Sequence, residues 1–388
     1  MKGRRKFLKD TATGALLLGS QNELGLAGML DLRAETDKPE EDQSHLKHNL
    51  PGQAPTTTLK MAQTPSLNIG YEQTGPDSGE AIVLLHGWPF DPRCYDDVRG
   101  PLATAGYRVI VPYLRCFGPT VFRSPDIFRS GQQSALGKDV IDLLDALRIE
   151  KATLVGYDLG GRAACVAAAL WPERVHALAS ATGYTILNLE KNAKEPGSIE
   201  VIRLSWYRWF LNTPLGEIEL ERDPEALARE CWKAWSPKWQ FTNAEFAATA
   251  KSFHNPDWIA TTLNCYRTWY GNAPGDPALQ KYEDQLAKKP KISVPTMILH
   301  GDSDALYPTA ASEGQESLFT GFYERRILGG SRTLPTQGRT TTLRERYRRS
   351  DGGIQEGLGD KEVLQQRRSL ARGGHETGEK STSGCHWV

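Results

Sequence analysis

Asp158 is the residue whose surroundings point most directly to chemistry. It lies in the segment VGYDLGGR, residues 155–162, between a strand-like run over 152–156 and a helix of small residues. In such a tight strand-to-helix turn, glycines at 156 and 160 leave room for neighbouring backbone, and one side chain stands clear of the sheet. A carboxylate there is ionised at pH 7 and suits displacement at the sp3 carbon of an epoxide or alkyl halide, giving an ester intermediate. The alternative is a buried Asp that caps the following helix.

A second loop supplies candidate donors for an oxyanion hole. The segment LHGWP, residues 85–89, closes a strand predicted over 81–85. In a loop of this kind the backbone N–H of Trp88, together with that of Leu159, would face the carboxyl oxygen of the ester. His86 belongs to the same loop, so we expect it to stabilise the turn rather than to act as the base.

A further carboxylate follows a later strand. The segment HGDSD, residues 300–304, ends the strand predicted over 295–299. Asp304 is placed to act as the acid that orients a catalytic histidine. Asp302 is the second choice for that role, or a simple turn residue.

The elements that must position these loops are strands alternating with helices. Continuous apolar runs of four to seven residues are typical of strands buried on both faces, as in a parallel sheet. Between two of them, Leu136, Val140, Leu143, Leu144 and Leu147 keep helical spacing. Strands and helices in alternation predict an α/β fold with right-handed crossovers. The predicted strands are 81–85, 108–112, 152–156, 295–299 and 322–328.

The order of the motifs resembles the α/β-hydrolase superfamily over roughly residues 65–330. HGWP, YLRCFG (113–118), GYDLGGR, WPERV (171–175) and HGDSD follow one another as in that superfamily. They are most similar to epoxide hydrolases and to haloalkane or haloacetate dehalogenases, which carry Asp at the turn. The resemblance implies an α/β-hydrolase fold, with a mostly parallel doubly wound sheet and an inserted helical cap.

The cap segment adds two candidate acids by resemblance. LNCYR, residues 263–267, is similar to the epoxide hydrolase segment Leu-Asn-Trp-Tyr-Arg, whose Tyr donates a hydrogen bond to the epoxide oxygen; this implies the role for Tyr266. A second such Tyr falls in SWYRWF, residues 205–210, where we choose Tyr207, with Trp206 as the alternative alignment. Simple packing of cap aromatics is the competing interpretation for both tyrosines.

Leu159 separates the candidate substrates. Haloalkane dehalogenases carry Asp-Trp at the turn, and haloacetate dehalogenases carry Asp-Arg. A leucine side chain has neither the indole N–H of Trp nor the guanidinium of Arg to donate. Arg115 matches an arginine of haloacetate dehalogenases but occurs more widely in the superfamily. We therefore expect a hydrolase acting on an epoxide that is small and apolar or weakly polar, with dehalogenation as the alternative. Cys116 stands where the superfamily pattern has Gly, and its side chain is expected to strain the loop.

The base of the superfamily pattern is missing. That pattern reads Gly-Gly-x-Gly-His-x-x-Pro after the last core strand, whereas this chain has ILGG, residues 327–330, and then SRTLP, residues 331–335. Without the histidine, an ester on Asp158 would lack the base that activates water. The eight histidines of the chain are His45, His48, His86, His176, His254, His300, His375 and His386.

The composition changes at the same point. Only 12 of the 58 residues from 331 to 388 are hydrophobic, against 39% of the whole chain. We expect this tail to be disordered, and its abrupt onset suggests a frameshift near Gly330.

The first residues resemble a twin-arginine (Tat) export signal. Arg4 and Arg5 precede Phe7 and Leu8, and a short, mildly apolar run follows over 11–19. We expect a periplasmic or exported protein, with the cytoplasm as the alternative. The predicted divisions are a signal segment 1–30, a polar linker 31–64, a core 65–183, a helical cap 184–290, a second core part 291–330 and the tail 331–388.

The overall composition excludes several classes of protein. The 388 residues carry 47 Lys+Arg and 47 Asp+Glu, which argues against a nucleic-acid binder. No apolar run reaches the roughly 18 residues of a membrane span. The six cysteines form no Cys-x-x-Cys pair, so neither a metal site nor a cofactor is expected. The oligomeric state is left open. A non-catalytic binding protein with the same fold, or a decayed coding sequence whose product folds poorly, is the alternative to an enzyme.

Overall fold

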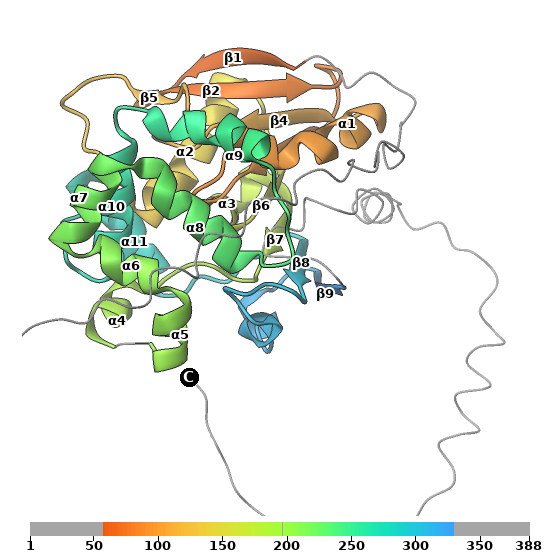
Figure 1. Ribbon diagram of the computed structural model, residues 1–388. Coiled ribbons are helices and arrows are strands. Elements are labelled where there is room, and N and C mark those ends of the chain that lie inside the picture. Colours follow the sequence, from red (N-terminus) through yellow and green to blue (C-terminus); the bar gives the residue numbers. More distant parts are fainter. Residues whose placement is uncertain (1–56, 196, 330–388) are drawn as a thin grey trace, which may run out of the picture. The chain divides into compact units, whose positions relative to one another are not determined.

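A central sheet forms the core of the protein. The computed structural model describes residues 57–195 and 197–329 (Figure 1), and the predicted export signal and tail lie outside these residues. Within the described ranges the sheet has nine strands in the order β1-β2-β4-β3-β6-β7-β8-β9, with β5 paired to β2. The strands are β1 (Thr58–Gln63), β2 (Leu67–Thr74), β3 (Ala81–Leu85), β4 (Arg108–Pro112), β5 (Val121–Phe122), β6 (Ala152–Gly156), β7 (Val175–Ala181), β8 (Thr296–Gly301) and β9 (Tyr323–Leu328).

The pairing of the strands is mostly parallel. Strands β4, β3, β6, β7, β8 and β9 pair in parallel, and β1, β2 and β5 add antiparallel pairs at one edge. All five residues of β3 and of β6 are buried, as their apolar runs predict. This arrangement confirms the predicted α/β fold with a mostly parallel sheet.

The predicted linker over 31–64 extends too far, because its last residues form strand β1. Five of the six residues of TLKMAQ are exposed, so the segment lacks the buried apolar run that marked the other strands. Its strand geometry comes from six registered pairs with β2, from Thr58 opposite Gln73 to Gln63 opposite Asn68. Pairing of backbone groups, not burial, makes this strand.

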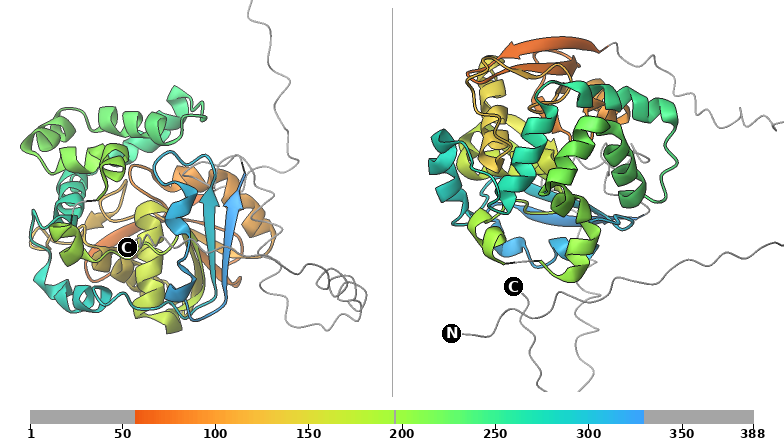
Figure 2. Two further views of the ribbon diagram at one scale, coloured as in Figure 1. Left: turned by 90° about the horizontal axis from the view of Figure 1, so that it is seen from below. Right: turned by 60° about the vertical axis from the view of Figure 1, so that its left-hand side comes forward.

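Helices cover the sheet and form a separate group at one side. Helices α2 (Gln133–Ala146) and α3 (Asp158–Leu170) pack against each other, and α3 packs on β3, β6 and β7; α1 (Asp96–Thr104) packs on β4. Figure 2 shows the other helices grouped beside the sheet. They lie between β7 and β8: α4 (Leu189–Lys194), α5 (Ile199–Leu204), α6 (Trp206–Leu211), α7 (Pro214–Arg222), α8 (Pro224–Trp235), α9 (Asn243–Ala250), α10 (Trp258–Trp269) and α11 (Gln280–Leu286).

Local capping explains why this helical segment, the cap, breaks into short pieces. Asp223 ends α7 and caps α8, since its Oδ1 accepts from the N–H groups of Glu225 and Ala226 at 3.0 Å each. Thr242 and Glu245 form a reciprocal capping box at the start of α9.

Polar contacts fasten the cap to the core. Asp91, in the loop after β3, accepts hydrogen bonds from Thr249 Oγ1 (3.1 Å) and Ser252 Oγ (2.8 Å) of the cap. Trp232 Nε1 donates to the carbonyl of Pro89 at 2.9 Å. Burial raises the pKa of Asp91 to about 6, although its hydrogen bonds oppose the shift.

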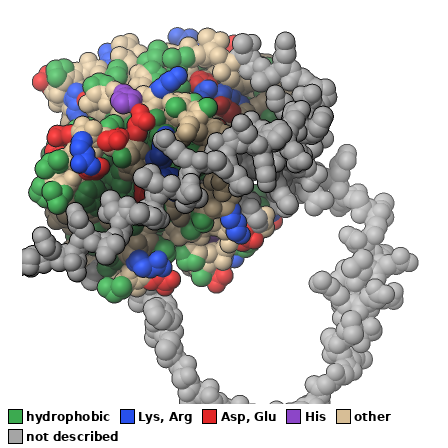
Figure 3. Space-filling view, viewed as in Figure 1, with side chains coloured by type: hydrophobic (Ala, Val, Ile, Leu, Met, Phe, Trp, Pro, Cys, Tyr) green, Lys and Arg blue, Asp and Glu red, His purple; other side chains and the backbone are tan. Residues whose placement is uncertain are grey.

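On the face seen in Figure 3, basic and acidic side chains are interspersed. In the described part of the chain, no helix has the length and apolar character needed to cross a membrane. The five cysteines found there are free and buried, and the described residues contain no cluster of metal-binding side chains.

Candidate active site

The turn that carries Asp158 is held by close backbone packing. Asp158 adopts φ = 50°, a left-handed conformation that is unusual for a side chain other than glycine. A Cβ on Gly160 would lie 2.1 Å from the carbonyl oxygen of Leu85, and one on Gly156 would lie 2.5 Å from the carbonyl carbon of Gly160. The two glycines therefore have the steric role inferred from the sequence, and the strained turn presents Asp158 at the end of β6.

The carboxylate of Asp158 meets a backbone donor from the neighbouring loop. Its Oδ1 accepts a hydrogen bond from the N–H of Trp88 at 2.8 Å. Leu159 lies in the first turn of α3, where backbone N–H groups have no partner within the helix. Both donors chosen for an oxyanion hole thus belong to segments that converge on this carboxylate.

His86 has a structural place in the same loop. Its Nδ1 lies 2.9 Å from the carbonyl oxygen of Gly87, and its Nε2 accepts from the N–H of Leu114 at 3.0 Å. Burial lowers the pKa of His86 to about 4, which keeps the ring neutral. With both ring nitrogens engaged, His86 stabilises its own turn, as we expected, and also joins it to the loop after β4.

Asp304 lies in the loop after β8. Its Oδ1 accepts from the backbone N–H groups of Leu306 and Tyr307 at 2.8 Å each, so the carboxylate organises its own loop. Asp304 is buried, whereas Asp302, the second choice, is exposed. Burial therefore favours Asp304 for the role of orienting acid.

Tyr207 and Tyr266 come together over the indole of Trp88. The ring of Tyr207 stacks on Trp88, with centroids 5.5 Å apart and planes 8° apart, and Tyr266 meets Trp88 edge-on at 5.4 Å. Burial raises the pKa of both phenols, and the negative charge of Asp158 adds to both shifts. Trp206, the alternative to Tyr207, is 42% exposed and contacts Phe210 instead.

A narrow apolar pocket adjoins these residues. Its volume is about 10 Å³, enough for one water molecule. An organic substrate therefore requires side chains or cap helices to move. The lining comprises Trp88, Leu114, Arg115, Cys116, Phe117, Gly131, Leu136, Leu159, Thr261, Thr262, Cys265 and Tyr266. A larger cavity of about 260 Å³, between Phe90, Trp232, Trp239 and α9, includes none of the predicted site residues.

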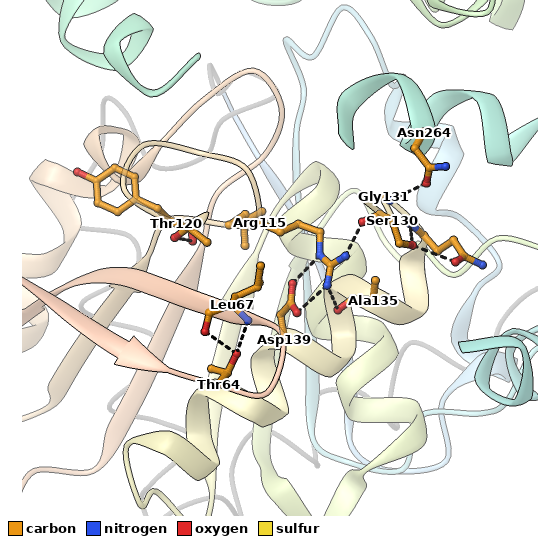
Figure 4. A network of polar contacts seen from close by, with 12 residues as sticks. Thr64, Leu67, Arg115, Thr120, Ser130, Gly131, Ala135, Asp139 and Asn264 are labelled. Carbon is orange, nitrogen blue, oxygen red and sulfur yellow. Dashed lines mark hydrogen bonds and ion pairs between the residues drawn. The ribbon is translucent and has the colours of Figure 1, made fainter. Parts of the chain in front are cut away.

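The guanidinium of Arg115 is fully occupied (Figure 4). Its Nε and Nη2 each lie 2.7 Å from the carboxylate of Asp139, and Nη1 donates to the carbonyl of Ser130. Next to it, Gly131 N donates to Oδ1 of Asn264 on α10 at 2.8 Å. Arg115 thus fixes the loops below the cap, and its paired charge offers no grip for a substrate carboxylate.

Cys116 shows the strain that its position implied. Its φ of 65° lies in the left-handed region, which disfavours a side chain. Cys265, which replaces the Trp of the epoxide hydrolase segment, lines the same pocket. Burial raises the pKa of both thiols, that of Cys265 to about 12, so both are protonated at neutral pH.

The histidines in the described ranges engage partners other than Asp158. His300 contacts Ser312 Oγ through Nδ1 (2.8 Å) and the carbonyl of Tyr307 through Nε2 (2.9 Å). His176 and His254 are exposed and lie 3.5 and 3.1 Å from Glu80 and Glu225. His45, His48, His375 and His386 lie outside the described residues.

Sequence reasoning missed Arg208. This arginine follows Tyr207 directly, is buried, and donates from Nε to the Tyr207 hydroxyl at 2.9 Å. The signal was present in SWYRWF, where one cation stands among four aromatic residues.

Comparisons with known proteins give one family model and several similar proteins. A family model described as alpha/beta hydrolase fold matches residues 80–331. An AB hydrolase superfamily protein of Bacillus subtilis is 27% identical over 247 residues, 63% of this chain and 81% of that protein. An epoxide hydrolase of Caballeronia sordidicola is 35% identical over 112 residues, 28% of this chain and 33% of that protein. A crystal structure of a proposed epoxide hydrolase from Klebsiella pneumoniae is 39% identical, with a TM-score of 0.71, over 74% of this chain and 95% of that one.

Proposed function

The chain belongs to the α/β-hydrolase fold family, in its epoxide hydrolase-like branch, and we propose that it opens epoxides by forming an ester on Asp158. The observation that carries this proposal is the placement of Tyr207 and Tyr266 around Trp88, whose N–H holds the Asp158 carboxylate. An epoxide needs both a nucleophile and a proton for its leaving oxygen, and this arrangement offers both.

The proposed first step is a displacement at carbon. An oxygen of Asp158 bonds to an epoxide carbon while the bond from that carbon to the ring oxygen breaks. The ring oxygen takes a proton from a tyrosine hydroxyl and becomes the hydroxyl of the ester product. The phenolate that remains recovers its proton from water before the next turnover.

The same residues fit dehalogenation less well. A leaving halide needs donors rather than a proton, and Leu159 places an apolar side chain next to Asp158. Arg115, the arginine shared with haloacetate dehalogenases, is bound to Asp139 and Ser130. Both points support an epoxide over a halogenated substrate.

The second step, hydrolysis of the ester, requires a base. The N–H groups of Trp88 and Leu159 would stabilise the tetrahedral intermediate, and Asp304 would orient a histidine. In residues 57–195 and 197–329 the histidines are engaged elsewhere. We therefore propose that the ester is long-lived and that turnover is slow.

Mass spectrometry of the intact protein tests both steps. After incubation with a styrene-type epoxide, the mass should rise by that of one epoxide, and peptide mapping should place the adduct on Asp158. The matched variant Asp158→Asn should form no adduct. Unmodified wild-type protein would contradict the proposed function and favour a binding protein. Steady multiple turnover would contradict a long-lived ester; His375→Gln and His386→Gln would then show whether either residue is the base.

We also propose export by the twin-arginine route, on the strength of Arg4 and Arg5. Replacing both with Lys should retain the protein in the cytoplasm of a bacterial host, while wild-type protein reaches the periplasm. Equal distribution of the two forms on cell fractionation would contradict this proposal.

A further inference from the structure

Arg208 is a buried cation held by phenols. It lies on α6 with 9% of its surface exposed, and its Nε donates to the Tyr207 hydroxyl at 2.9 Å. Its Nη2 donates to the hydroxyl of Tyr307, and its guanidinium carbon lies 5.3 Å from the ring centroid of Trp269. Across the described ranges, no carboxylate lies within ion-pair distance of Arg208.

This arrangement carries a free-energy cost in the resting protein. A buried charge without a counter-ion is unfavourable, and hydrogen bonds offset that cost only in part. The groups that face Arg208 are the phenols of Tyr207, Tyr266 and Tyr270 in the cap and of Tyr307 in the core. The cation therefore lacks an anion unless one of these phenols ionises.

Proton donation by Tyr207 would supply that anion. Because Arg208 donates to the Tyr207 oxygen, the proton of the phenol is left to point elsewhere. When that proton moves to the epoxide oxygen, the phenolate forms next to a fixed guanidinium donor. A donor already in place where charge develops stabilises the transition state without reorganisation.

Tyr266 differs from Tyr207 in this respect. Its ring contacts are with Trp88, Tyr207 and Trp269, at 5.1 to 5.6 Å between centroids. The charge of Arg208 opposes the rise in the pKa of Tyr266, but the hydrogen bond of Arg208 goes to Tyr207. The two tyrosines are therefore unequal, and Tyr207 has the better-stabilised conjugate base.

We propose that Arg208 is a positioning residue that directs the Tyr207 proton toward the substrate and stabilises the Tyr207 phenolate during epoxide opening. This inference rests on the proposed function. Arg208 also links α6 to the acid loop, because Tyr307 donates from its backbone N–H to Asp304 Oδ1 at 2.8 Å. Its contacts thus connect the ring-opening tyrosine with the loop of the orienting acid.

A double-mutant cycle on ester formation tests the inference. The rate of adduct formation on Asp158 is measured by intact mass in a single turnover with a styrene-type epoxide. Arg208→Gln should slow this rate by about 10- to 100-fold, less than the roughly 100- to 1000-fold effect of a donor that contacts the reacting atoms, because Arg208 acts through Tyr207. Arg208→Lys, which retains the charge and a donor, should recover part of the loss. In a Tyr207→Phe background, Arg208→Gln should have little further effect.

The control separates positioning from simple docking of the cap. Arg129 also joins core to cap, through Asp257 at 2.9 Å, but does not contact Tyr207. Arg129→Gln should leave the rate within about 2-fold of wild type. Equal slowing by Arg208→Gln with and without the Tyr207 hydroxyl, or no slowing, would overturn the inference. If Arg208→Gln does not fold, Arg208→Lys completes the same cycle. Failure of wild-type protein to form any adduct would instead overturn the proposed function itself.

Discussion

The chemistry proposed for Asp158 depends on which neighbours each side chain has. Tyr207 and Tyr266 are both buried, and the charge of Asp158 raises the pKa of both phenols. Of the two, only Tyr207 accepts a hydrogen bond from Arg208. Arg115 lines the pocket beside Trp88 and Tyr266, but its guanidinium is paired with the carboxylate of Asp139. Residue type alone therefore does not assign a role at this site.

Loss of either tyrosine hydroxyl should slow ester formation. Tyr207→Phe and Tyr266→Phe each retain the ring contacts with Trp88 but remove a proton donor, so we expect the single-turnover rate to fall about 100-fold or more. Trp206→Phe, which changes the exposed neighbour, should leave the rate within about 2-fold. A large effect of Trp206→Phe with none of Tyr207→Phe would show that the alternative alignment is correct.

Cys116 offers a test of backbone strain. At φ = 65°, a residue with a side chain incurs a penalty of about 1–2 kcal/mol that glycine avoids. Glycine loses about 0.5–1 kcal/mol of this advantage, because it has greater conformational freedom in the unfolded chain. Cys116→Gly should therefore be more stable than Cys116→Ala by about 0.5–1 kcal/mol in urea unfolding. At Cys94, in a short 3-10 helix (Pro92–Tyr95), the order should reverse, with Ala more stable than Gly. The same order at both sites would argue against strain at Cys116.

At the scale of elements, the site depends on how closely α3 approaches the end of β3. The Cβ that Gly160 lacks would collide with the carbonyl groups of Leu85 and His86, at 2.1 and 2.5 Å. Backbone atoms cannot rotate away as a side chain can. The strand-turn-helix unit around Asp158 can therefore form in this position only with glycine at 160.

Two neighbouring glycines on α3 should respond very differently to alanine. Gly160→Ala forces α3 away from β3, and we expect a loss of about 3 kcal/mol or more in the free energy of unfolding. At Gly161 the nearest atom would lie 3.3 Å from a new Cβ. Gly161→Ala should therefore change stability by about 1 kcal/mol or less. Urea unfolding of both variants measures the difference, and similar values would contradict the packing described for this turn.

At the scale of the whole molecule, polar groups join the cap to the core. Asp91 holds Thr249 and Ser252, and Arg129 holds Asp257. The pocket at Trp88 and Tyr266 has room for about one water molecule, so an organic substrate requires side chains or cap helices to move.

The Asp91 contact should make stability depend on pH. Burial raises the pKa of Asp91 from 3.8 to about 6, so its contribution to stability is fully present below about pH 4 and is lost as the pH rises through 6. Asp91→Asn cannot ionise. The stability of Asp91→Asn relative to wild type should therefore increase by about 2–3 kcal/mol from pH 4 to pH 7 in urea unfolding. The exposed Asp97→Asn is the control, and a flat difference for Asp91→Asn would contradict a buried ionisable group.

The sequence by itself determined β3, β4, β6, β8 and β9, the turn at Asp158 and the loop at Trp88, but it did not predict the parallel strand β7. These features rest on local causes: apolar runs bury strands, and a tight turn with a clashing Cβ requires glycine at 156 and 160. A motif matched residue by residue also placed Tyr266 and Asp304, whose catalytic roles remain predictions. The export signal and the tail remain predictions as well.

Only the tertiary structure decided the features that depend on distant partners. Strand β1 exists through its pairing with β2. Burial distinguished Tyr207 from Trp206 as the candidate acid. The ion pair of Arg115 with Asp139 removed Arg115 as a candidate for binding a substrate carboxylate. Arg208 became meaningful when Tyr307, 99 residues away along the chain, was found beside it. The physical reason is common to all four cases. Burial and pairing are properties of the partners that folding brings together, and a local sequence pattern does not contain them.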